Sequence, residues 1–210
     1  MTSAPLLLLP LQNNFELIVG DTVMYLGDRW ISDRLGESTY VWQPLSFPSG
    51  KAPTIDFHPV WSIDPSSGAV TVPDEKVFTA AKAKTAGSAK LTSCDSCSGG
   101  QLATYVGGGS GNTITFENVS TPSGKGGKNW AAVYFVDGDA YPKYRNGTAQ
   151  VGSSEAVSFE YAPGGHTDGT LNVIPVLLDF GSGGPTSVTI AGEGDSYAAD
   201  ISHLVVYDTA

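Results

Sequence analysis

Basic residues, histidine and cysteine are scarce in this chain, and long hydrophobic runs are missing. Its 210 residues contain 11 Lys and Arg against 21 Asp and Glu, so the formal net charge at neutral pH is -10. Such an excess of carboxylates repels phosphate backbones and anionic lipid headgroups, so we expect no nucleic acid partner. No stretch approaches the roughly 20 consecutive apolar residues of a membrane-spanning helix, so we expect no membrane insertion. Neutral or cationic ligands remain.

The apolar stretch from Ala4 to Leu11 lacks the features of a secretory signal. No Lys or Arg precedes it, Pro5 and Pro10 interrupt it, and no small-residue cleavage site follows. We therefore expect a strand or the lead-in to one. Two sequons, at Asn118 and Asn146, would accept N-glycans in the secretory pathway. An extracellular location and a leaderless intracellular one both fit the sequence.

The only two cysteines, Cys94 and Cys97, lie in the run Cys-Asp-Ser-Cys-Ser-Gly-Gly. A redox pair needs a βαβ context, and a zinc site needs two further soft ligands. The flanking residues instead favour a loop, and the three histidines lie far apart in the sequence. We favour a local disulfide between these cysteines, with a pair of free thiols as the alternative.

Hydrophobic periodicity predicts strands almost throughout. Residues 113–119 and 157–161 alternate apolar and polar side chains, as half-buried strands do. Continuous apolar runs at 131–136, 173–180 and 204–207 are typical of central strands. The segment from Glu75 to Lys90 is rich in Ala and Lys, but its small-residue alternation also favours a strand. The sequence therefore predicts an all-β fold, with glycine-rich turns between the strands.

The composition changes near Pro73. Three of the four tryptophans (Trp30, Trp42 and Trp61) precede it, and glycine becomes more frequent after it. We expect a first segment over residues 1–72 and a second domain over residues 73–210. Within the first segment, residues 15–19 and 22–26 predict a hairpin across Gly20-Asp21.

Ordered motifs in the first 70 residues resemble a known enzyme family. They comprise Gln12-Asn13-Asn14-Phe15, Tyr25-Leu26-Gly27-Asp28-Arg29-Trp30, Ser38 to Leu45, and Trp61-Ser62-Ile63-Asp64. This segment resembles the last strands of the five-bladed β-propeller of glycoside hydrolase family 43, in the branch of the fungal exo-β-1,3-galactanases. It covers only the closing strands of such a propeller.

The remainder, from about Val77 to Tyr207, resembles a carbohydrate-binding module of family 35, of the galactan-binding type. The matching motifs are Cys94 to Gly100, Tyr105-Val106-Gly107, Ile114 to Val119, and Tyr197-Ala198-Ala199-Asp200-Ile201. The resemblance implies a β-jelly-roll sandwich, preceded by a small N-terminal β-sheet segment.

The resemblance also implies that the enzymatic chemistry is missing. The family's two catalytic carboxylates lie in propeller blades upstream of the segment matched here. Asp21, Asp28, Asp33 and Glu37 are close together in sequence, but without the other blades they have no enclosing pocket. We therefore expect no enzyme activity and assign no catalytic residue.

Sugar recognition needs carboxylates or amides for paired hydroxyls, close backbone approach, and an aromatic face for the C–H patch of the ring. By similarity to the galactan-binding members, Gly138, Tyr197 and Asp200 are the expected galactose contacts, with Asp139 in the same loop as Gly138. Arg145 is expected to donate to a ring or axial oxygen. The alternative is structural: Tyr197 as an edge residue of the core, and Asp200 as a turn cap. Tyr141, Tyr144 and Asn146 are weaker candidates.

Members of the module family commonly hold a structural calcium ion between a first-strand acidic pattern and a last-strand aspartate. The matching positions here are Phe78-Thr79-Ala80-Ala81 and Ser202, which carry no carboxylate. We expect no cofactor and no calcium ion at that site, with Lys82 or hydrogen bonding filling the space.

Three hypotheses follow. The favoured one is a non-catalytic lectin that recognises terminal galactose or β-galactosides. Under this lectin hypothesis, two copies can pair as a homodimer. Pairing would bury the tryptophans of the first segment and give the assembly two sugar-binding sites. The second is a C-terminal fragment or accessory chain of a galactan-degrading glycoside hydrolase. The third is a structural β protein without a ligand.

Overall fold

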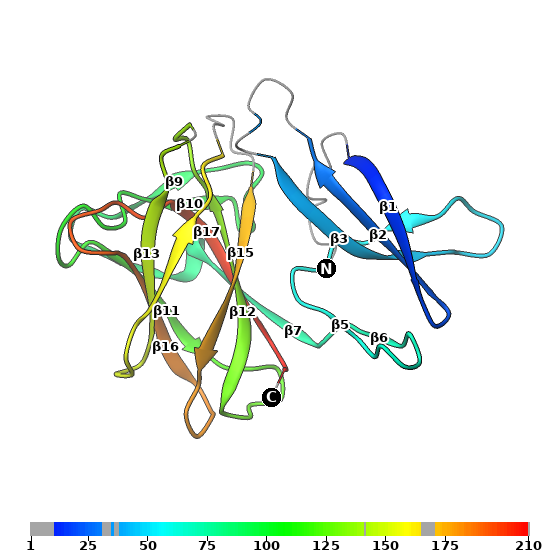
Figure 1. The fold of residues 1–210 in the computed structure, drawn as a ribbon. Helices are drawn as coiled ribbons and strands as arrows, with labels where there is room; N and C mark the ends of the chain where they lie inside the picture. Colours follow the sequence, from blue (N-terminus) through cyan, green and yellow to red (C-terminus); the bar gives the residue numbers. More distant parts are fainter. Residues whose placement is uncertain (1–10, 31–34, 36–37, 141, 165–170, 210) are drawn as a thin grey trace. The chain divides into compact units, whose positions relative to one another are not determined.

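A computed structural model describes residues 11–30, 35, 38–140, 142–164 and 171–209. The chain divides into two compact units, Met1–Val72 and Pro73–Ala210, and each is considered by itself. Both consist of antiparallel strands joined by turns, and the described residues include no α-helix (Figure 1). The prediction of an all-β protein is confirmed. The strand expected over residues 4–11 falls almost wholly outside the described residues.

The first unit contains a four-stranded antiparallel sheet in the order β1-β2-β3-β4. These strands are β1 (Leu11–Val19), β2 (Thr22–Arg29), β3 (Thr39–Ser46) and β4 (Thr54–Ile55). The predicted hairpin is present, since Val19 pairs with Thr22 across a two-residue turn in which Gly20 has a φ of 55°. A separate two-stranded ribbon joins β5 (Ser62–Ile63) to β6 (Val70–Thr71).

The two faces of this first sheet differ in burial. Tyr25, Val41 and Gln43 alternate along β2 and β3 and are buried. The Gln43 amide exchanges two hydrogen bonds with the backbone of His58, at 3.0 and 3.1 Å, and so fixes the segment after β4. On the opposite face Phe15, Leu26 and Trp42 form one cross-strand row, in which Phe15 and Trp42 are exposed.

The tryptophans of the first unit differ in exposure within a single chain, and their burial by pairing of two copies stays a prediction. Trp30 and Trp42 both remain exposed. Trp42 points from the face of β3 opposite to the buried Val41 and Gln43, because successive side chains of a strand point to opposite faces. Trp61 is half-buried.

The second unit is a β-sandwich of two sheets, as the predicted jelly-roll requires (Figure 1). The first sheet has the order β15-β12-β17-β10-β9, with β7 also paired to β17. The second has the order β14-β13-β16-β11-β8. The first sheet comprises β7 (Glu75–Thr79), β9 (Lys90–Ser93), β10 (Gln101–Thr104), β12 (Lys128–Val136), β15 (Asn172–Asp179) and β17 (Asp200–Tyr207). The second comprises β8 (Lys84–Ala86), β11 (Thr113–Val119), β13 (Arg145–Val151), β14 (Val157–Tyr161) and β16 (Thr186–Gly192).

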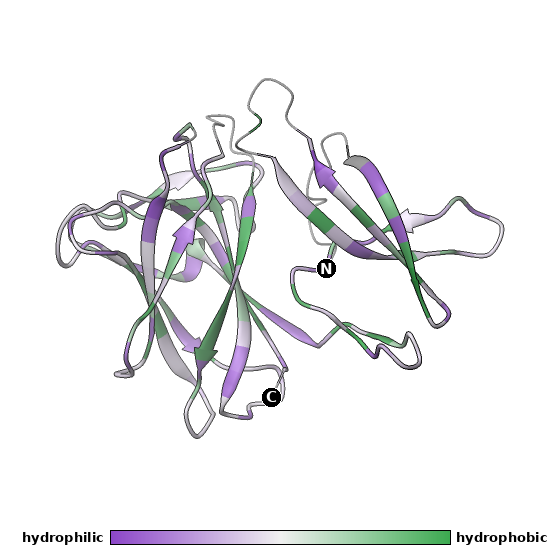
Figure 2. Ribbon diagram, in the orientation of Figure 1, coloured by the Kyte–Doolittle hydropathy of each residue, from purple (hydrophilic) through white to green (hydrophobic). Residues whose placement is uncertain are grey.

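Both sheets contribute buried side chains to one hydrophobic core. Phe116 and Ile190 come from the second sheet, while Phe135, Leu178 and Leu204 come from the first, and all five are almost completely buried. Hydrophobic and hydrophilic segments alternate along these strands (Figure 2), as expected where only one face of each sheet meets a core. Burial of so many large apolar side chains is the main force that holds the two sheets together.

The segment from Glu75 to Lys90 forms strands, with two interruptions, a 3-10 helix and a turn over residues 87–89. Strand β7 runs into a short 3-10 helix, Ala80–Lys82, and β8 follows after one residue. Ala80 is completely buried at this bend. The Ala-rich composition therefore reflects close packing at the edge of the core rather than a long helix.

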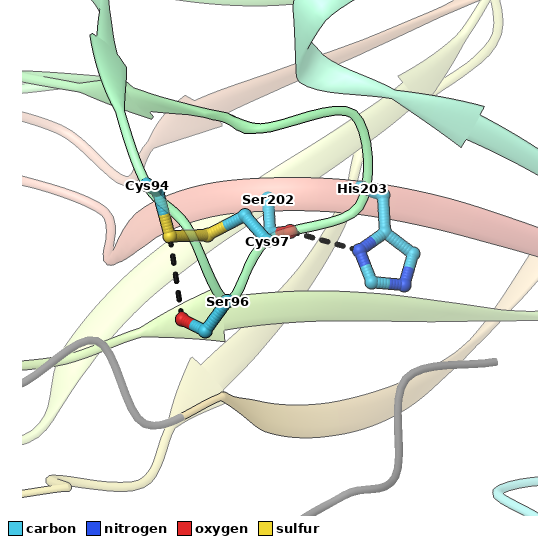
Figure 3. The surroundings of a disulfide bond; sticks show 5 residues. All are labelled: Cys94, Ser96, Cys97, Ser202 and His203. Atoms are coloured by element: carbon cyan, nitrogen blue, oxygen red, sulfur yellow. Dashed lines mark hydrogen bonds between the residues drawn. A yellow bond between two sulfur atoms is a disulfide. The ribbon is translucent and has the colours of Figure 1, made fainter.

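Cys94 and Cys97 form the expected disulfide (Figure 3). The loop around them is closed by backbone hydrogen bonds from Cys94 N to Gly100 O at 3.0 Å and from Gly100 N to Cys97 O at 2.9 Å. Cys97 is buried and belongs to a small cluster with Leu102 and Val136. The disulfide thus fixes a tight loop that packs against the first sheet.

Candidate functional site

Strand order brings the predicted sugar-contacting residues to one end of the sandwich. Arg145 begins β13 and Asp200 begins β17, while Asp137 directly follows β12. Strands β12 and β17 are neighbours, and Val136 pairs with Asp200. The loop that follows β12 therefore lies next to the loop that leads into β17.

Arg145 joins these two loops. Its Nε donates to Asp139 Oδ2 at 2.9 Å and lies 3.3 Å from Asp137 Oδ1. Its Nη1 donates to the carbonyl oxygen of Ala198 at 3.0 Å. The guanidinium is partly exposed, so it has further N–H groups to offer to a ligand. One side chain thus ties the Asp139 loop to the loop that carries Tyr197.

Asp137 is a member of this cluster that the sequence did not single out. It is completely buried, and its Oδ1 accepts the backbone N–H of Asp139 at 3.0 Å. Its Oδ2 has no hydrogen-bond partner among the residues that the structure describes. Burial raises the pKa of this carboxyl, and the backbone hydrogen bond and Arg145 only partly oppose the shift. The sequence signal was the repeated aspartate in Asp-Gly-Asp.

The two predicted carboxylates differ in their pKa values. The hydrogen bond from Arg145 lowers the pKa of Asp139 below its ordinary value. Partial burial raises the pKa of Asp200 to about 6, an effect that Arg145 opposes and Asp137 reinforces. The Asp200 carboxylate also accepts the backbone N–H of Tyr105. At neutral pH both groups are mainly ionised, so both can accept hydrogen bonds from hydroxyl groups.

Tyr197 supplies an aromatic surface beside the charged cluster. Its ring lies against the backbone of Gly108, where an added Cβ would overlap the ring. The backbone around it is fixed by hydrogen bonds from Gly108 N to Ser196 O at 2.8 Å and from Ala198 N to Val106 O at 2.9 Å. Because the Tyr197 side chain is still 48% exposed, it is a supported surface ring and not a buried core residue.

Tyr105 is a second aromatic residue at this end, and the sequence did not predict it as a site residue. Its backbone has a φ of 58°, a left-handed conformation that non-glycine residues rarely adopt. Its ring is exposed, and Lys90 Nζ lies 4.9 Å from the ring centroid. Rare backbone geometry at an exposed aromatic residue is typical of functional loops. Such geometry cannot be read from the sequence.

The remaining candidates are placed less decisively. Gly138 is exposed between Asp137 and Asp139, as close backbone approach by a ligand would require. Tyr144 is exposed, and Asn146 lies within β13 with its side chain exposed. Tyr141 lies outside the described residues.

The residues at the implied calcium position do not fit a calcium ion. Thr79 pairs with His203, and Ser202 Oγ lies 2.9 Å from His203 Nδ1 within hydrogen-bonding distance (Figure 3). Gly99 of the disulfide loop is so close that a Cβ there would lie 3.0 Å from Thr79 Cβ and 3.2 Å from Ala81 Cβ. Calcium needs six to eight oxygen ligands, mostly from carboxylates. Methyl and hydroxyl groups fill this position instead.

Lys82 does not fill that space, because it is exposed. Across the described part of the chain, no cluster of three or more Asp, Glu, His or Cys residues is arranged to hold a metal ion. In the first unit Asp21 is exposed and Asp28 is half-buried, whereas Asp33 and Glu37 lie outside the described residues. No helix among the described residues is long and apolar enough to span a membrane.

Comparison with known proteins gives matches among solved structures only. No family model and no curated protein matches the chain. An exo-β-1,3-galactanase from Phanerochaete chrysosporium, solved with galactose, is 36% identical with a TM-score of 0.75. A glutamate-to-glutamine variant of that enzyme, solved with β-1,3-galactotriose, is 35% identical with a TM-score of 0.76.

The likeness to the galactanase extends over both units. It covers 94% of this chain but only 44% of the enzyme, so the chain spans less than half of that protein's length. A family 35 carbohydrate-binding module from Clostridium thermocellum is similar over 63% of this chain and 98% of its own, with 22% identity and a TM-score of 0.56. A family 35 module from Cellvibrio japonicus is 13% identical, over 65% of this chain and 95% of its own, with a TM-score of 0.53. These two modules share the fold of the second unit.

Proposed function

We propose that this chain is a non-catalytic carbohydrate-binding protein, a lectin, that recognises terminal galactose and β-galactosides. The observation that carries the proposal is the contact of Arg145 with Asp139 and with the Ala198 carbonyl. It gathers N–H donors, carboxylate acceptors and the supported ring of Tyr197 at one partly exposed place. Donors and acceptors for hydroxyl groups beside an aromatic face are what a pyranose ring requires.

Each residue has a distinct role in this proposal. Tyr197 covers the apolar C–H patch of the sugar ring, and Asp200 and Asp139 accept hydrogen bonds from hydroxyl groups. Arg145 donates to a ring or axial oxygen through the N–H groups that its protein contacts leave free, and exposed Gly138 lets the backbone approach. The similar galactanase was solved with galactose and with β-1,3-galactotriose, which supports the choice of galactose.

We propose that the chain is non-catalytic because of the part of the galactanase to which it is similar. By resemblance, the first unit corresponds to closing strands of a propeller whose catalytic carboxylates lie upstream. In line with this, the described carboxyl groups whose pKa values are raised, Asp137 and Asp200, belong to the second unit, where the charge of Arg145 acts on both. A glycosidase needs two carboxyl groups that flank the scissile bond.

Binding to immobilised glycans tests the proposal directly. We expect signal on glycans that end in β-galactose, and loss of at least about 1.4 kcal/mol, or tenfold in Kd, in Tyr197→Ala and in Asp200→Ala. Phe47→Ala is the matched control, because Phe47 is 60% exposed and follows β3 in the first unit, away from the site. No galactoside signal from the unaltered chain would reject the lectin function, and undiminished binding by both site variants would reject the site.

The likeness over both units also favours a second candidate, a C-terminal fragment or accessory chain of a galactan-degrading hydrolase. It predicts release of galactose from β-1,3-galactan once the remaining blades are supplied on another polypeptide. Continued inactivity with every such partner would count against it.

We further propose that two copies associate as a homodimer through the first unit. Phe15, Tyr40 and Trp42 are exposed on one face of its sheet, and exposed apolar faces of this kind commonly mark interaction surfaces. Two sites per assembly would strengthen binding to clustered glycans. Light scattering should give twice the 21.8 kDa chain mass, and Trp42→Ser should give the monomer.

A further inference from the structure

Resting on the proposed function, we propose that this site selects its sugar by charge. It takes a neutral hexose or one that carries a protonated amine, and it rejects a uronic acid. The inference depends on the excess of carboxylates over cations around the sugar contacts, and on where those carboxylates are buried.

Three carboxylates share one guanidinium at the centre of the site. Arg145 Nε lies 2.9 Å from Asp139 Oδ2 and 3.3 Å from Asp137 Oδ1, and its charge also acts on Asp200. One positive charge cannot neutralise three negative ones. A sugar carboxylate that approached Arg145 would therefore compete with carboxylates that already hold it, and it would meet their repulsion.

A second observation shows that this negative charge is incompletely satisfied. The Asp137 side chain is fully buried, and its Oδ2 has no hydrogen-bond partner in the described part of the chain. The Tyr161 hydroxyl is buried and also lacks a partner there, and the charge of Asp137 acts on it. A buried charge is weakly screened by solvent, so its field reaches the mouth of the site more strongly than that of a surface carboxylate.

The rim adds acidic residues. Glu160 pairs with Asn146 across β13 and β14, Glu193 donates its backbone N–H to Asn146 O at 3.1 Å, and Asp195 is two residues before Tyr197. Two lysines oppose them, Lys143 beside Asp139 and Lys90 over the Tyr105 ring. Both are exposed on flexible stems. Solvent and salt screen such mobile charges more than the buried ones.

An ammonium group on the sugar has the opposite effect to a carboxylate. It brings three N–H donors to acceptors that outnumber the cations of the site. A neutral hydroxyl donates hydrogen bonds to the same carboxylates without a charge term. Electrostatic complementarity of this kind mainly sets specificity between related ligands.

Calorimetric titration at pH 7 with methyl β-galactoside, galactosamine and galacturonic acid tests the inference. At about 0.02 M NaCl, where charges act over long distances, we expect galacturonic acid to bind at least about tenfold more weakly than the neutral galactoside. Galactosamine should bind at least as tightly as the galactoside. Both differences should shrink at about 0.5 M NaCl.

A pair of variants separates local charge from overall charge. Asp195→Asn removes a rim carboxylate, whereas Glu155→Gln removes an exposed one in the turn beyond Val151, at the opposite end of β13. We expect Asp195→Asn to reduce the galacturonic acid penalty about twofold at low salt, with the galactoside Kd unchanged. Glu155→Gln should change neither.

The outcomes distinguish this inference from the proposed function. Galactoside binding with equal or tighter binding of galacturonic acid overturns selection by charge and leaves the lectin function standing. So does a penalty that responds neither to salt nor to Asp195→Asn. Binding of none of the three sugars overturns the proposed function and this inference with it.

Discussion

The ring of Tyr197 rests on the backbone of Gly108, and glycine is the only residue that leaves room for it. Gly108 has a φ of 70°, so its backbone also favours glycine. The neighbouring residue Gly107 pairs with Tyr197 as an isolated bridge between the two loops. The position of the aromatic surface is therefore set by a glycine far away in the sequence.

Replacement of Gly108 by alanine should move the Tyr197 ring and weaken galactoside binding by about tenfold or more, because the sugar would lose its flat support. Titration calorimetry measures the affinity. Gly181→Ala is the matched control: Gly181 has a φ of 56°, and nothing lies within 4 Å of an added Cβ. Both variants should lose about 1–2 kcal/mol of stability from left-handed backbone strain. Equal affinity in the two would contradict the supporting role of Gly108.

Galactoside affinity should fall as the pH drops through about 6. The pKa of Asp200 is raised to about 6 by burial, so its carboxylate takes up a proton there and stops accepting two hydroxyl hydrogen bonds. Asp137, whose pKa burial also raises, adds to the loss at lower pH. Calorimetric titrations with the galactoside at several values between about pH 7.5 and about pH 5, which bracket the pKa of Asp200, measure this change in affinity.

The Asp200→Asn variant provides the control for this prediction. It should bind more weakly at pH 7, and its affinity should change less than that of the unaltered chain between pH 7 and pH 6. Because the folded pKa of Asp200 lies above the unfolded one, its ionisation destabilises the fold at pH 7, and this cost disappears as the pH falls toward 4. Affinity and the Asp200 contribution to stability should therefore change in opposite directions. A parallel change would contradict the assignment.

His203 should make the fold less stable in acid. Burial lowers the pKa of its imidazole to about 4, and its ring stacks on Tyr134 with the centroids 4.1 Å apart. Because the unfolded chain binds this proton more readily, stability is complete above pH 6.5 and falls as the pH drops toward 4. The loss is on the order of 2–3 kcal/mol by urea unfolding.

His203→Phe keeps an aromatic ring for the stack and removes the titrating group. Its stability should change less between neutral pH and pH 4.5, a value near the lowered pKa, even though Ser202 loses its partner and the variant is less stable overall. An equal acid loss in the variant and the unaltered chain would show that another group is responsible.

Calcium and chelators should leave the thermal stability unchanged. Thr79, Ala81 and Ser202 offer no carboxylate, so neither calcium nor EDTA should shift the Tm measured by scanning calorimetry. A rise in Tm with calcium would contradict the interpretation of the position formed by these three residues.

Loss of the disulfide should lower the thermal stability. The Cys94–Cys97 bond closes a very short loop, for which the chain-entropy relation gives a stabilisation of about 2 kcal/mol. The Cys94→Ser/Cys97→Ser variant should therefore melt several degrees lower.

Local sequence patterns predicted the strands and tight turns well, because these depend on neighbouring residues. The alternation over residues 113–119 gives the bounds of β11, and Gly20-Asp21 forms the expected hairpin turn. The Cys94–Cys97 disulfide is also local. The Ala80–Lys82 turn was not foreseen, since the burial of Ala80 that favours it depends on the tertiary core.

The candidate site was only partly accessible to sequence reasoning. Gly138, Asp139, Tyr197 and Asp200 came from resemblance, Arg145 came from its hydrogen-bond donors, and the structure brings the five together. That juxtaposition depends on the contact between Arg145 and Ala198, which are 53 residues apart. Asp137 was not among the predicted contacts, because the Asp-Gly-Asp motif does not show which of its two aspartates is buried. Tyr105 was missed because its left-handed backbone is set by long-range contacts.

A crystal structure of the chain soaked with galactose would show whether the sugar binds at Tyr197. We expect a sugar whose ring covers Tyr197, with hydroxyl groups within hydrogen-bonding distance of Asp200, Asp139 and the Arg145 guanidinium. Galactose bound elsewhere, for example on the exposed aromatic face of the first unit, would contradict this expectation. So would a site that stays empty at saturating sugar in crystals where Tyr197 is free of lattice contacts.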